Sequence, residues 1–207
     1  MFNSKIKSTF VLLYILSMIN INGCSKTIKP INNHELPENT VLLISIDGFK
    51  WNYIEQASTP NFDKFIHGGV RSKGLIPSFP SKTFPSHITI VTGKHPSGHG
   101  IISNRMFDPI FNEYFYIGEN SKPVLDGKWY EAEPIWVTTE KQGKKAMTMF
   151  WPSSDAEIMG VRPSEYFVYD GSISHNERIS QIIRWMDYPP EKRPHLITLY
   201  FSDVDSK

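Results

Sequence analysis

Cysteine, net charge and long apolar segments are all scarce in this chain of 207 residues. A single cysteine, Cys24, excludes an internal disulfide, so the fold has to depend on a hydrophobic core. A net charge of +1 gives no reason to expect nucleic-acid binding, which needs a clustered basic face. Repeats, low-complexity tracts and long charge runs are also missing from the sequence, and one domain is the simplest expectation.

The composition that remains is that of a folded protein. Hydrophobic residues make up 40% of the chain, charged residues 21% and aromatic residues 13%, the last being a generous share. A chain of this length can bury one sizeable core.

The N-terminus carries the parts of a secretory signal. Two lysines precede the apolar run 10–21, and the small residue Gly23 precedes Cys24. The run is too short to span a bilayer comfortably as a mature helix. Residues 1–24 are therefore predicted to be a signal peptide.

The four residues 21–24 resemble a bacterial lipobox, in which the cysteine becomes the lipidated first residue of the mature protein. Under this interpretation residues 25–39 form a tether and residues 40–207 form the folded domain. The protein is then expected to be exported to the periplasm or the cell surface and held at the membrane by the lipid on Cys24. A plain cleaved signal followed by an incidental cysteine is the alternative.

Strands are predicted to alternate with helices along the chain. The expected strands are 41–46, 146–150 and 195–201, and the expected helices are 59–67, 83–92, 133–143 and one that Asn176 caps, with Ile179, Ile182, Ile183 and Met186 on one face. The first strand is continuously apolar, as expected for a strand buried on both faces of a parallel sheet. The alternation predicts a parallel sheet flanked by helices.

Two aspartates follow predicted strands, and a threonine between them begins a predicted helix. Asp47 comes directly after strand 41–46, and Asp205 follows strand 195–201. Because ligands of open α/β sheets bind at the carboxyl ends of the strands, both carboxylates are expected at one site. Thr83 is a poor nucleophile unless a metal or a base lowers its pKa, so the three residues together indicate a metal-activated threonine.

Each of these residues also has a purely structural interpretation. Asp47 with Gly48 is compatible with an ordinary turn, and Thr83 is compatible with a helix N-cap. Asp205, close to Asp203, is compatible with a solvated acidic turn. The interpretation as a site depends on their occurring together.

Several segments of the chain occur in the order that is typical of one enzyme family. In chain order they are Asp47-Gly48-Phe49, Lys82-Thr83-Phe84-Pro85, Thr92-Gly93, Pro96, His99-Gly100-Ile101, Glu133-Pro134-Ile135-Trp136, Phe150-Trp151-Pro152 and Tyr200-Phe201 with Asp205. From about Val41 to its last residue the chain resembles the nucleotide pyrophosphatase/phosphodiesterase family of the alkaline-phosphatase-like superfamily. The resemblance implies an α/β fold, a three-layer α/β/α sandwich with a mostly parallel sheet that is incomplete at the C-terminus.

The same resemblance implies two zinc ions and part of their ligands. Asp47 and the nucleophile Thr83 would serve one zinc ion, and Asp205 would serve the other. The family's four other protein ligands are a histidine shortly after the second aspartate, an Asp-His pair and a later histidine, and they would lie beyond Lys207. The chain therefore looks like the N-terminal half of a phosphodiesterase domain.

The resemblance also implies a set of substrate-binding residues. Asn104 falls on the asparagine that contacts the phosphate in the family. Phe84 and Tyr169 would sandwich the nucleotide base, and Trp151 and Asp155 would line the same pocket. The alternative for the aromatic residues is that they are simply part of the core.

Two kinds of function follow from these observations. The first is zinc-dependent hydrolysis of phosphodiester or pyrophosphate bonds in nucleotides and related compounds through a phosphothreonine intermediate, with lipid-headgroup diesters as a variant substrate class. The second is a truncated, non-catalytic remnant or a surface-anchored binding protein, because four expected ligands are missing.

Two further possibilities are set aside on the sequence. His87, His95 and His99 are not expected to bind the metal, because the prolines and glycines around the last two prevent a helix that would align them. A sulfatase is excluded because residues 82–86 lack the Cys/Ser-x-Pro-x-Arg pattern in which sulfatases mature their nucleophile.

Overall fold

The computed structural model describes residues 40–118 and 121–205. The predicted signal peptide (1–24), Cys24 and the tether (25–39) lie outside the described residues. In the ranges that are described, no helix is both long enough and apolar enough to cross a bilayer.

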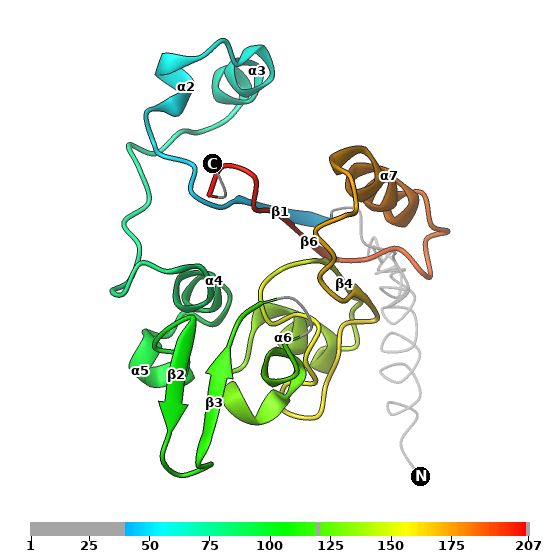
Figure 1. Ribbon diagram of the computed structural model, residues 1–207. Coiled ribbons are helices and arrows are strands. Elements are labelled where there is room, and N and C mark those ends of the chain that lie inside the picture. The colour runs from blue at the N-terminus through cyan, green and yellow to red at the C-terminus, as the bar shows by residue number, and fades with distance from the viewer. Residues whose placement is uncertain (1–39, 119–120, 206–207) are drawn as a thin grey trace, which may run out of the picture. The chain divides into compact units, whose positions relative to one another are not determined.

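A four-stranded parallel sheet forms the centre of the folded part (Figure 1). Its strands are β1 (Val41–Ile46), β6 (Leu196–Phe201), β4 (Ala146–Met149) and β5 (Glu165–Phe167), in that spatial order. The first described strand therefore pairs with the last, Val41 opposite Leu196 and Ile46 opposite Phe201. This register brings the carboxyl ends of β1 and β6 to the same edge of the sheet.

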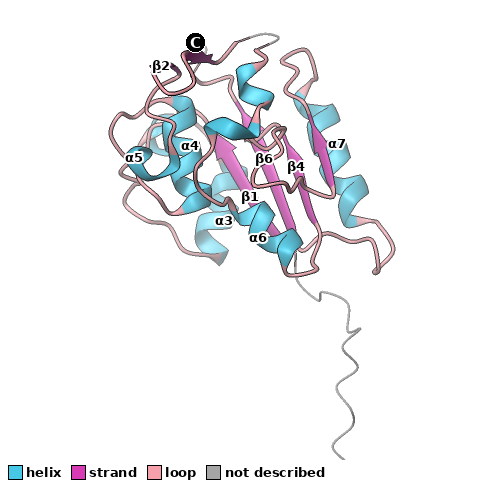
Figure 2. Cartoon of the chain, turned by 90° about the horizontal axis from the view of Figure 1, so that it is seen from below, coloured by secondary structure: helices cyan, strands magenta, loops and turns pink. Residues whose placement is uncertain are grey.

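Helices cover both faces of the sheet (Figure 2). On one face, α4 (Thr83–Thr92) and α6 (Ile135–Lys141) pack through Ile88 and Trp136 into one core cluster. On the other face, α7 (His175–Met186) packs through Trp185 into a second cluster. The predicted three-layer α/β/α arrangement is confirmed.

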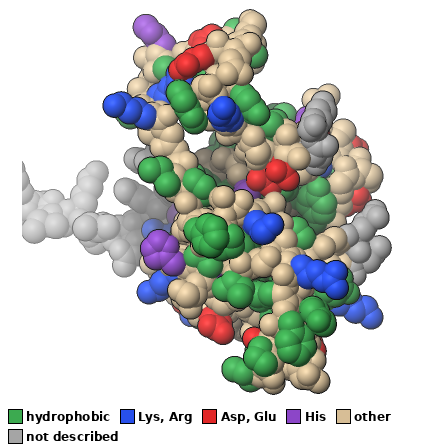
Figure 3. All heavy atoms as spheres, turned by 60° about the vertical axis from the view of Figure 1, so that its left-hand side comes forward, with side chains coloured by type: hydrophobic (Ala, Val, Ile, Leu, Met, Phe, Trp, Pro, Cys, Tyr) green, Lys and Arg blue, Asp and Glu red, His purple; other side chains and the backbone are tan. Residues whose placement is uncertain are grey.

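The remaining elements lie outside this sandwich or at its border. They are α2 (Tyr53–Gln56), α3 (Pro60–Gly68), α5 (Pro96–His99), the 3-10 turns η1 (Pro123–Leu125) and η2 (Gly127–Trp129), and a hairpin of β2 (Arg105–Asp108) and β3 (Glu113–Tyr116). None of the residues of α3 is buried, and Phe65 within it is largely exposed. Figure 3, in which the left-hand side of Figure 1 comes forward, shows apolar side chains on this side of the folded part.

The prediction that the first strand is buried on both faces is wrong. β1 is the outer strand of the described sheet, and Val41 and Ile44 are 62% and 50% exposed. A continuous apolar run cannot tell a central strand from an edge strand, because that depends on which other strands pair with it.

The predicted cap of α7 is also wrong, although the helix itself is confirmed. Ser174 is the N-cap: its hydroxyl accepts from the Glu177 N–H, and the Glu177 carboxylate accepts from the Ser174 N–H and hydroxyl. This is a reciprocal capping box, which satisfies two backbone donors at once. Asn176 lies inside the first turn instead.

The buried face of α7 is rotated from the predicted one. Ile182 is buried, but Ile179, Ile183 and Met186 are each substantially exposed. The helix instead turns Arg178, Gln181 and Trp185 inward. Arg178 is accommodated there because its guanidinium donates to backbone carbonyls, one of them that of Tyr200.

Candidate active site

The Asp47 carboxylate is held from two sides at the end of β1. Its Oδ2 accepts a hydrogen bond from the Tyr200 hydroxyl at 2.9 Å, and its Oδ1 accepts from the Gly48 N–H at 3.0 Å. Burial and the neighbouring Asp47 carboxylate raise the pKa of Tyr200, so its hydroxyl keeps its proton and remains a donor. The orientation of Asp47 is therefore set by the strand beside it.

The Asp205 backbone lies directly against the turn that follows Asp47. Gly48 has a φ of +70°, and a Cβ at this position would lie 2.7 Å from the Cα of Asp205. Asp203, the nearby alternative, is occupied elsewhere, because its carboxylate pairs with His175 at 2.6 Å. Asp47 and Asp205 thus lie close together in the segments that follow the paired strands β1 and β6.

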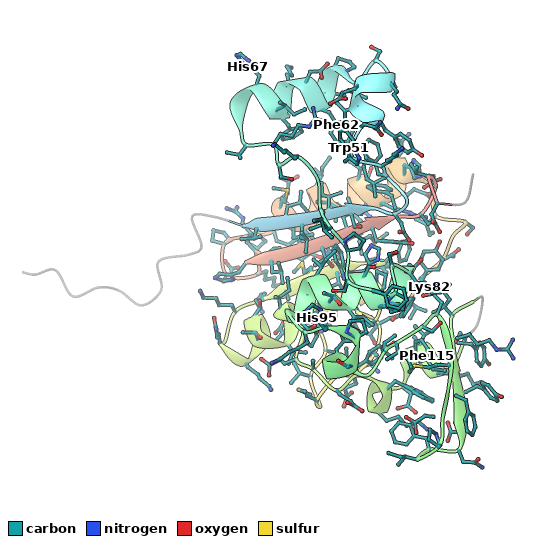
Figure 4. The ribbon with its side chains drawn as sticks, turned by 90° about the vertical axis from the view of Figure 1, so that its left-hand side faces the viewer. Trp51, Phe62, His67, Lys82, His95 and Phe115 are labelled. Carbon is teal, nitrogen blue, oxygen red and sulfur yellow. The ribbon has the colours of Figure 1, made fainter. Side chains whose placement is uncertain are left out.

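Thr83 is the first residue of α4, which begins after Lys82, labelled in Figure 4. The N-cap is Lys82, so the interpretation of Thr83 as an N-cap is wrong. Asn104 lies next to this helix start, where its Oδ1 accepts a hydrogen bond from the Phe84 N–H at 3.0 Å. That bond fixes the amide, and its NH₂ group is left to donate elsewhere.

His87 connects the start of α4 to β1. One ring nitrogen, Nδ1, lies 2.7 Å from the Thr83 carbonyl oxygen, and the other, Nε2, lies 2.7 Å from the Ser45 hydroxyl. The ring also packs edge-on against Trp151 and Tyr200. Burial lowers the pKa of His87, which favours the neutral ring. Both nitrogens are engaged within the protein.

The predicted base-binding residues differ in exposure. Phe84 is 8% exposed and packs edge-on against Phe115 in the core, and Trp151 is buried as well. The surroundings of Phe84 and Trp151 are those of core residues, which favours the alternative that these aromatic residues belong to the core rather than to a base-binding pocket. Tyr169 is 47% exposed, packs against Phe150 and shares a hydrogen bond with Ser202. Of the set, Tyr169 offers the most surface to a ligand.

Asp155 is a buried carboxyl near this surface. Burial raises its pKa to about 6, although backbone N–H groups, including that of Tyr169, and the nearby Arg162 oppose the rise. The Arg162 guanidinium donates to the Asp155 carbonyl oxygen at 2.6 Å rather than to the carboxylate. Among residues 40–118 and 121–205 the Asp155 carboxyl group therefore forms no ion pair.

This burial predicts a pH-dependent stability. The native pKa of about 6 is above the ordinary 3.8, so native Asp155 holds a proton that the unfolded chain has released. Stability should fall as pH rises from about 4 to about 6. The Asp155→Asn variant should lose that slope and should be more stable at pH 7 by about 1–3 kcal/mol in urea unfolding.

Asp170 is the matched control for this prediction. Its exposed carboxylate accepts hydrogen bonds from Ser172, which lower its pKa, so Asp170→Asn should not remove the slope. A slope that Asp155→Asn leaves unchanged would contradict the assignment.

Asp47, Asp205 and Thr83 are the predicted metal ligands among the described residues. Two carboxylates and one hydroxyl are the kinds of ligand that Asp47, Asp205 and Thr83 offer. Across ranges 40–118 and 121–205 no group of three or more histidine, cysteine or acidic side chains is placed to hold a metal ion. A catalytic zinc site takes three protein ligands plus water, so these residues do not complete one by themselves.

Three contacts of the site were not predicted from the sequence. Ser45 and Tyr200 are paired neighbours on β1 and β6. The Ser45 hydroxyl bonds His87, and the Tyr200 hydroxyl bonds the Asp47 carboxylate. The third contact is that of His87 with the Thr83 carbonyl. The only signal for His87 in the sequence is its position four residues after Thr83, the spacing of neighbours on a helix.

Comparison with known proteins gives a consistent result. The family model described as "Type I phosphodiesterase / nucleotide pyrophosphatase" matches residues 41–207. The chain is 44% identical over 167 residues to ectonucleotide pyrophosphatase/phosphodiesterase family member 1 of Homo sapiens, covering 80% of this chain and 18% of that protein. It is 37% identical over 204 residues to an uncharacterized pyrophosphatase/phosphodiesterase of Schizosaccharomyces pombe, covering 93% of this chain and 41% of that protein.

A solved structure is similar as well. The murine ectonucleotide pyrophosphatase/phosphodiesterase 5, an inactive threonine-to-alanine variant in complex with AMP, aligns with a TM-score of 0.77 at 35% identity. The alignment covers 82% of this chain and 44% of that one. The chain thus spans less than half the length of these relatives.

Proposed function

Because the chain belongs to the type I phosphodiesterase/nucleotide pyrophosphatase family, we propose that it carries the nucleophile half of an active site that hydrolyses phosphodiester or pyrophosphate bonds in nucleotides. The observation that carries the proposal is the meeting of the Asp47–Gly48 turn with Asp205, together with the His87 side chain that bonds both β1 and the Thr83 carbonyl. Two carboxylates that follow strand ends and a hydroxyl at a helix start are the kinds of group that a metal-assisted phosphoryl transfer uses.

Thr83 is the proposed nucleophile. Its Oγ attacks phosphorus in line and gives up its proton to solvent, so that an Oγ–P bond forms while the bond from phosphorus to the leaving oxygen breaks and the leaving group departs. Water then attacks the phosphothreonine, the Oγ–P bond breaks, and a nucleoside monophosphate leaves as Thr83 regains its proton. The amide of Asn104 donates to a non-bridging oxygen as negative charge develops there. The N-terminus of α4 adds a favourable dipole for the phosphate.

Two zinc ions are the proposed cofactors. Asp47 and Thr83 would hold one ion and Asp205 the other, each with further ligands from beyond Lys207 as the resemblance implies. When bound, the ions supply Lewis-acid stabilisation of charge on the nucleophile and the leaving oxygen. Tyr200 contributes from this chain, because its hydroxyl fixes the orientation of the Asp47 carboxylate.

A nucleotide is the proposed substrate. Tyr169 keeps an exposed ring on which a base can stack, and the murine relative of known structure is described in complex with AMP. Asp155 and Trp151 are buried and would shape the pocket rather than present large areas to the ligand.

The function is tested by comparing two versions of the protein. The 207-residue chain is expected to bind zinc weakly and to hydrolyse a chromogenic nucleotide diester slowly or not at all, because its ligand set is incomplete. A version extended through the histidine and Asp-His segments of the family should bind zinc and turn over. Zinc content and diesterase rate are measured on both. Full activity of the 207-residue chain would contradict the ligand assignment, and two inactive versions would favour a binding protein.

The protein is also proposed to be exported and anchored by a lipid on Cys24, a residue outside the described structure. The Cys24→Ser variant should release the mature protein from membranes, because one lipid-bearing residue is the whole anchor. Membrane and soluble fractions are compared by immunoblot. Wild-type protein that is already soluble would contradict the anchor.

A further inference from the structure

His87 lies buried between the proposed nucleophile and the strand that carries Asp47. It belongs to the second turn of α4, one turn after Thr83. Its two hydrogen bonds, to the Thr83 carbonyl and to the Ser45 hydroxyl, are both 2.7 Å long. Ser45 is two residues before Asp47 on β1, so the ring spans the gap between helix and strand at the level of the site.

The partners fix the tautomer of the ring. A carbonyl oxygen only accepts hydrogen bonds, so Nδ1 must carry the proton that points to Thr83. In the neutral ring Nε2 then accepts, and the Ser45 hydroxyl donates to it. This arrangement aims each polar atom of His87 at one partner.

The bond to Thr83 restrains the peptide plane directly after the nucleophile. The same carbonyl lies in the first turn of α4, so a second donor there limits rocking of the helix start. The ring also packs edge-on against Tyr200 at 5.2 Å between centroids, and the Tyr200 hydroxyl holds Asp47. The His87 side chain thus contacts both α4, which begins with Thr83, and β1, which Asp47 follows.

Resting on the function proposed above, we propose that His87 is a positioning residue that sets the spacing between Thr83 and Asp47. It takes no proton from the substrate and binds no metal. Its effect is geometric: when the bond to Ser45 is present, α4 cannot move away from β1 without breaking it. A displacement of about 1 Å at a reacting group can reduce the rate by about 10²-fold.

His99 provides a matched control. It is also a buried histidine whose Nε2 lies near a hydroxyl, that of Thr89, at 3.1 Å, and whose Nδ1 accepts from the Ile101 N–H. It joins α4 to α5 through Thr89, in the second half of the helix. Replacing either histidine by glutamine should lower the thermal unfolding temperature, but only His87 should affect the site.

The first test is kinetic and uses the extended version of the protein proposed above. His87→Gln should lower kcat by about 10–100-fold with KM changed less than about threefold, because alignment rather than binding is lost. Ser45→Ala should give a smaller loss in the same direction, and Ser45→Thr, which keeps the hydroxyl, should restore most of it. His99→Gln should leave kcat within about threefold. Equal kcat losses in His87→Gln and His99→Gln would overturn the proposal, since both would then report stability.

The second test does not depend on turnover. Imidazole ¹⁵N NMR of the protein should show His87 with a protonated Nδ1 and an unprotonated Nε2, and Ser45→Ala should change the Nε2 signal. In a chelator competition His87→Gln should weaken zinc binding by about 10-fold, and His99→Gln should not. An unprotonated Nδ1, or equal zinc affinities, would overturn the proposal even in a protein that hydrolyses no diester. Inactive wild-type protein with the expected tautomer and zinc shift would refute the proposed function alone.

Discussion

Replacing Thr83 with alanine is expected to reduce diester hydrolysis by the extended protein by about 10⁴-fold or more, since removal of a nucleophile removes the covalent route altogether. The fold should survive, because Lys82 and not Thr83 is the N-cap of α4. Zinc binding should be weakened only in part, since Asp47 and Asp205 stay in place. The measurements are the diesterase rate, zinc content and acid-quench trapping of phosphothreonine.

Thr92→Ala is the matched control for that variant. Thr92 ends the same helix, and its hydroxyl donates to the Ile88 carbonyl at 2.7 Å, away from the carboxylates. It should remain active and form the phosphoenzyme. Appreciable turnover by Thr83→Ala, or trapping of phosphate on another residue, would show that Thr83 is not the nucleophile.

Replacing Gly48 with alanine should damage both stability and the site. At a φ of +70° any side chain costs roughly 1–2 kcal/mol, and the new Cβ would also meet the Asp205 backbone at 2.7–2.8 Å. Relief of that contact has to move Asp205 or the Asp47 turn, which adds about 1–3 kcal/mol. We expect the extended variant to lose about 10²-fold in diesterase rate as the two carboxylates separate.

Gly93→Ala separates the two effects of that substitution. Gly93 has a similar φ of +65°, but a Cβ there would meet nothing within 4 Å. It should lose about 1–2 kcal/mol in urea unfolding and keep its activity. If Gly48→Ala behaves like Gly93→Ala in both assays, the close approach of Asp205 has no consequence for the site.

Local signals in the sequence predicted local structure well. The helix 83–92 was placed to the residue because Gly93 ends it, and the strand 41–46 because turn residues bound its apolar run. The convergence of Asp47 with Asp205 followed from their equivalent places after parallel strands. These features depend on neighbours along the chain or on the general geometry of parallel sheets.

Features that depend on distant residues were not predicted. Which side of α7 is buried depends on the residues of the sheet that it packs against. Arg178 is buried because it donates to a backbone carbonyl of β6, and the hydrophobic periodicity of the helix does not predict this contact. The helix begins after Ser174 rather than after Asn176, because Glu177 completes a capping box with Ser174. The His87–Ser45 bond joins residues 42 positions apart, and nothing in either segment alone indicates the other.

The pairing of β1 with β6 has a consequence for the order of folding. In the described sheet every residue of β1, the first strand described, pairs with one of β6, the last strand described, so β1 has no strand partner until β6 has been synthesised. Contacts between such distant segments slow folding, because the entropy of closing a long loop is lost before the contacts can stabilise the chain. Under the proposed export this delay would keep the nascent chain unfolded during translocation, and the sheet would form afterwards.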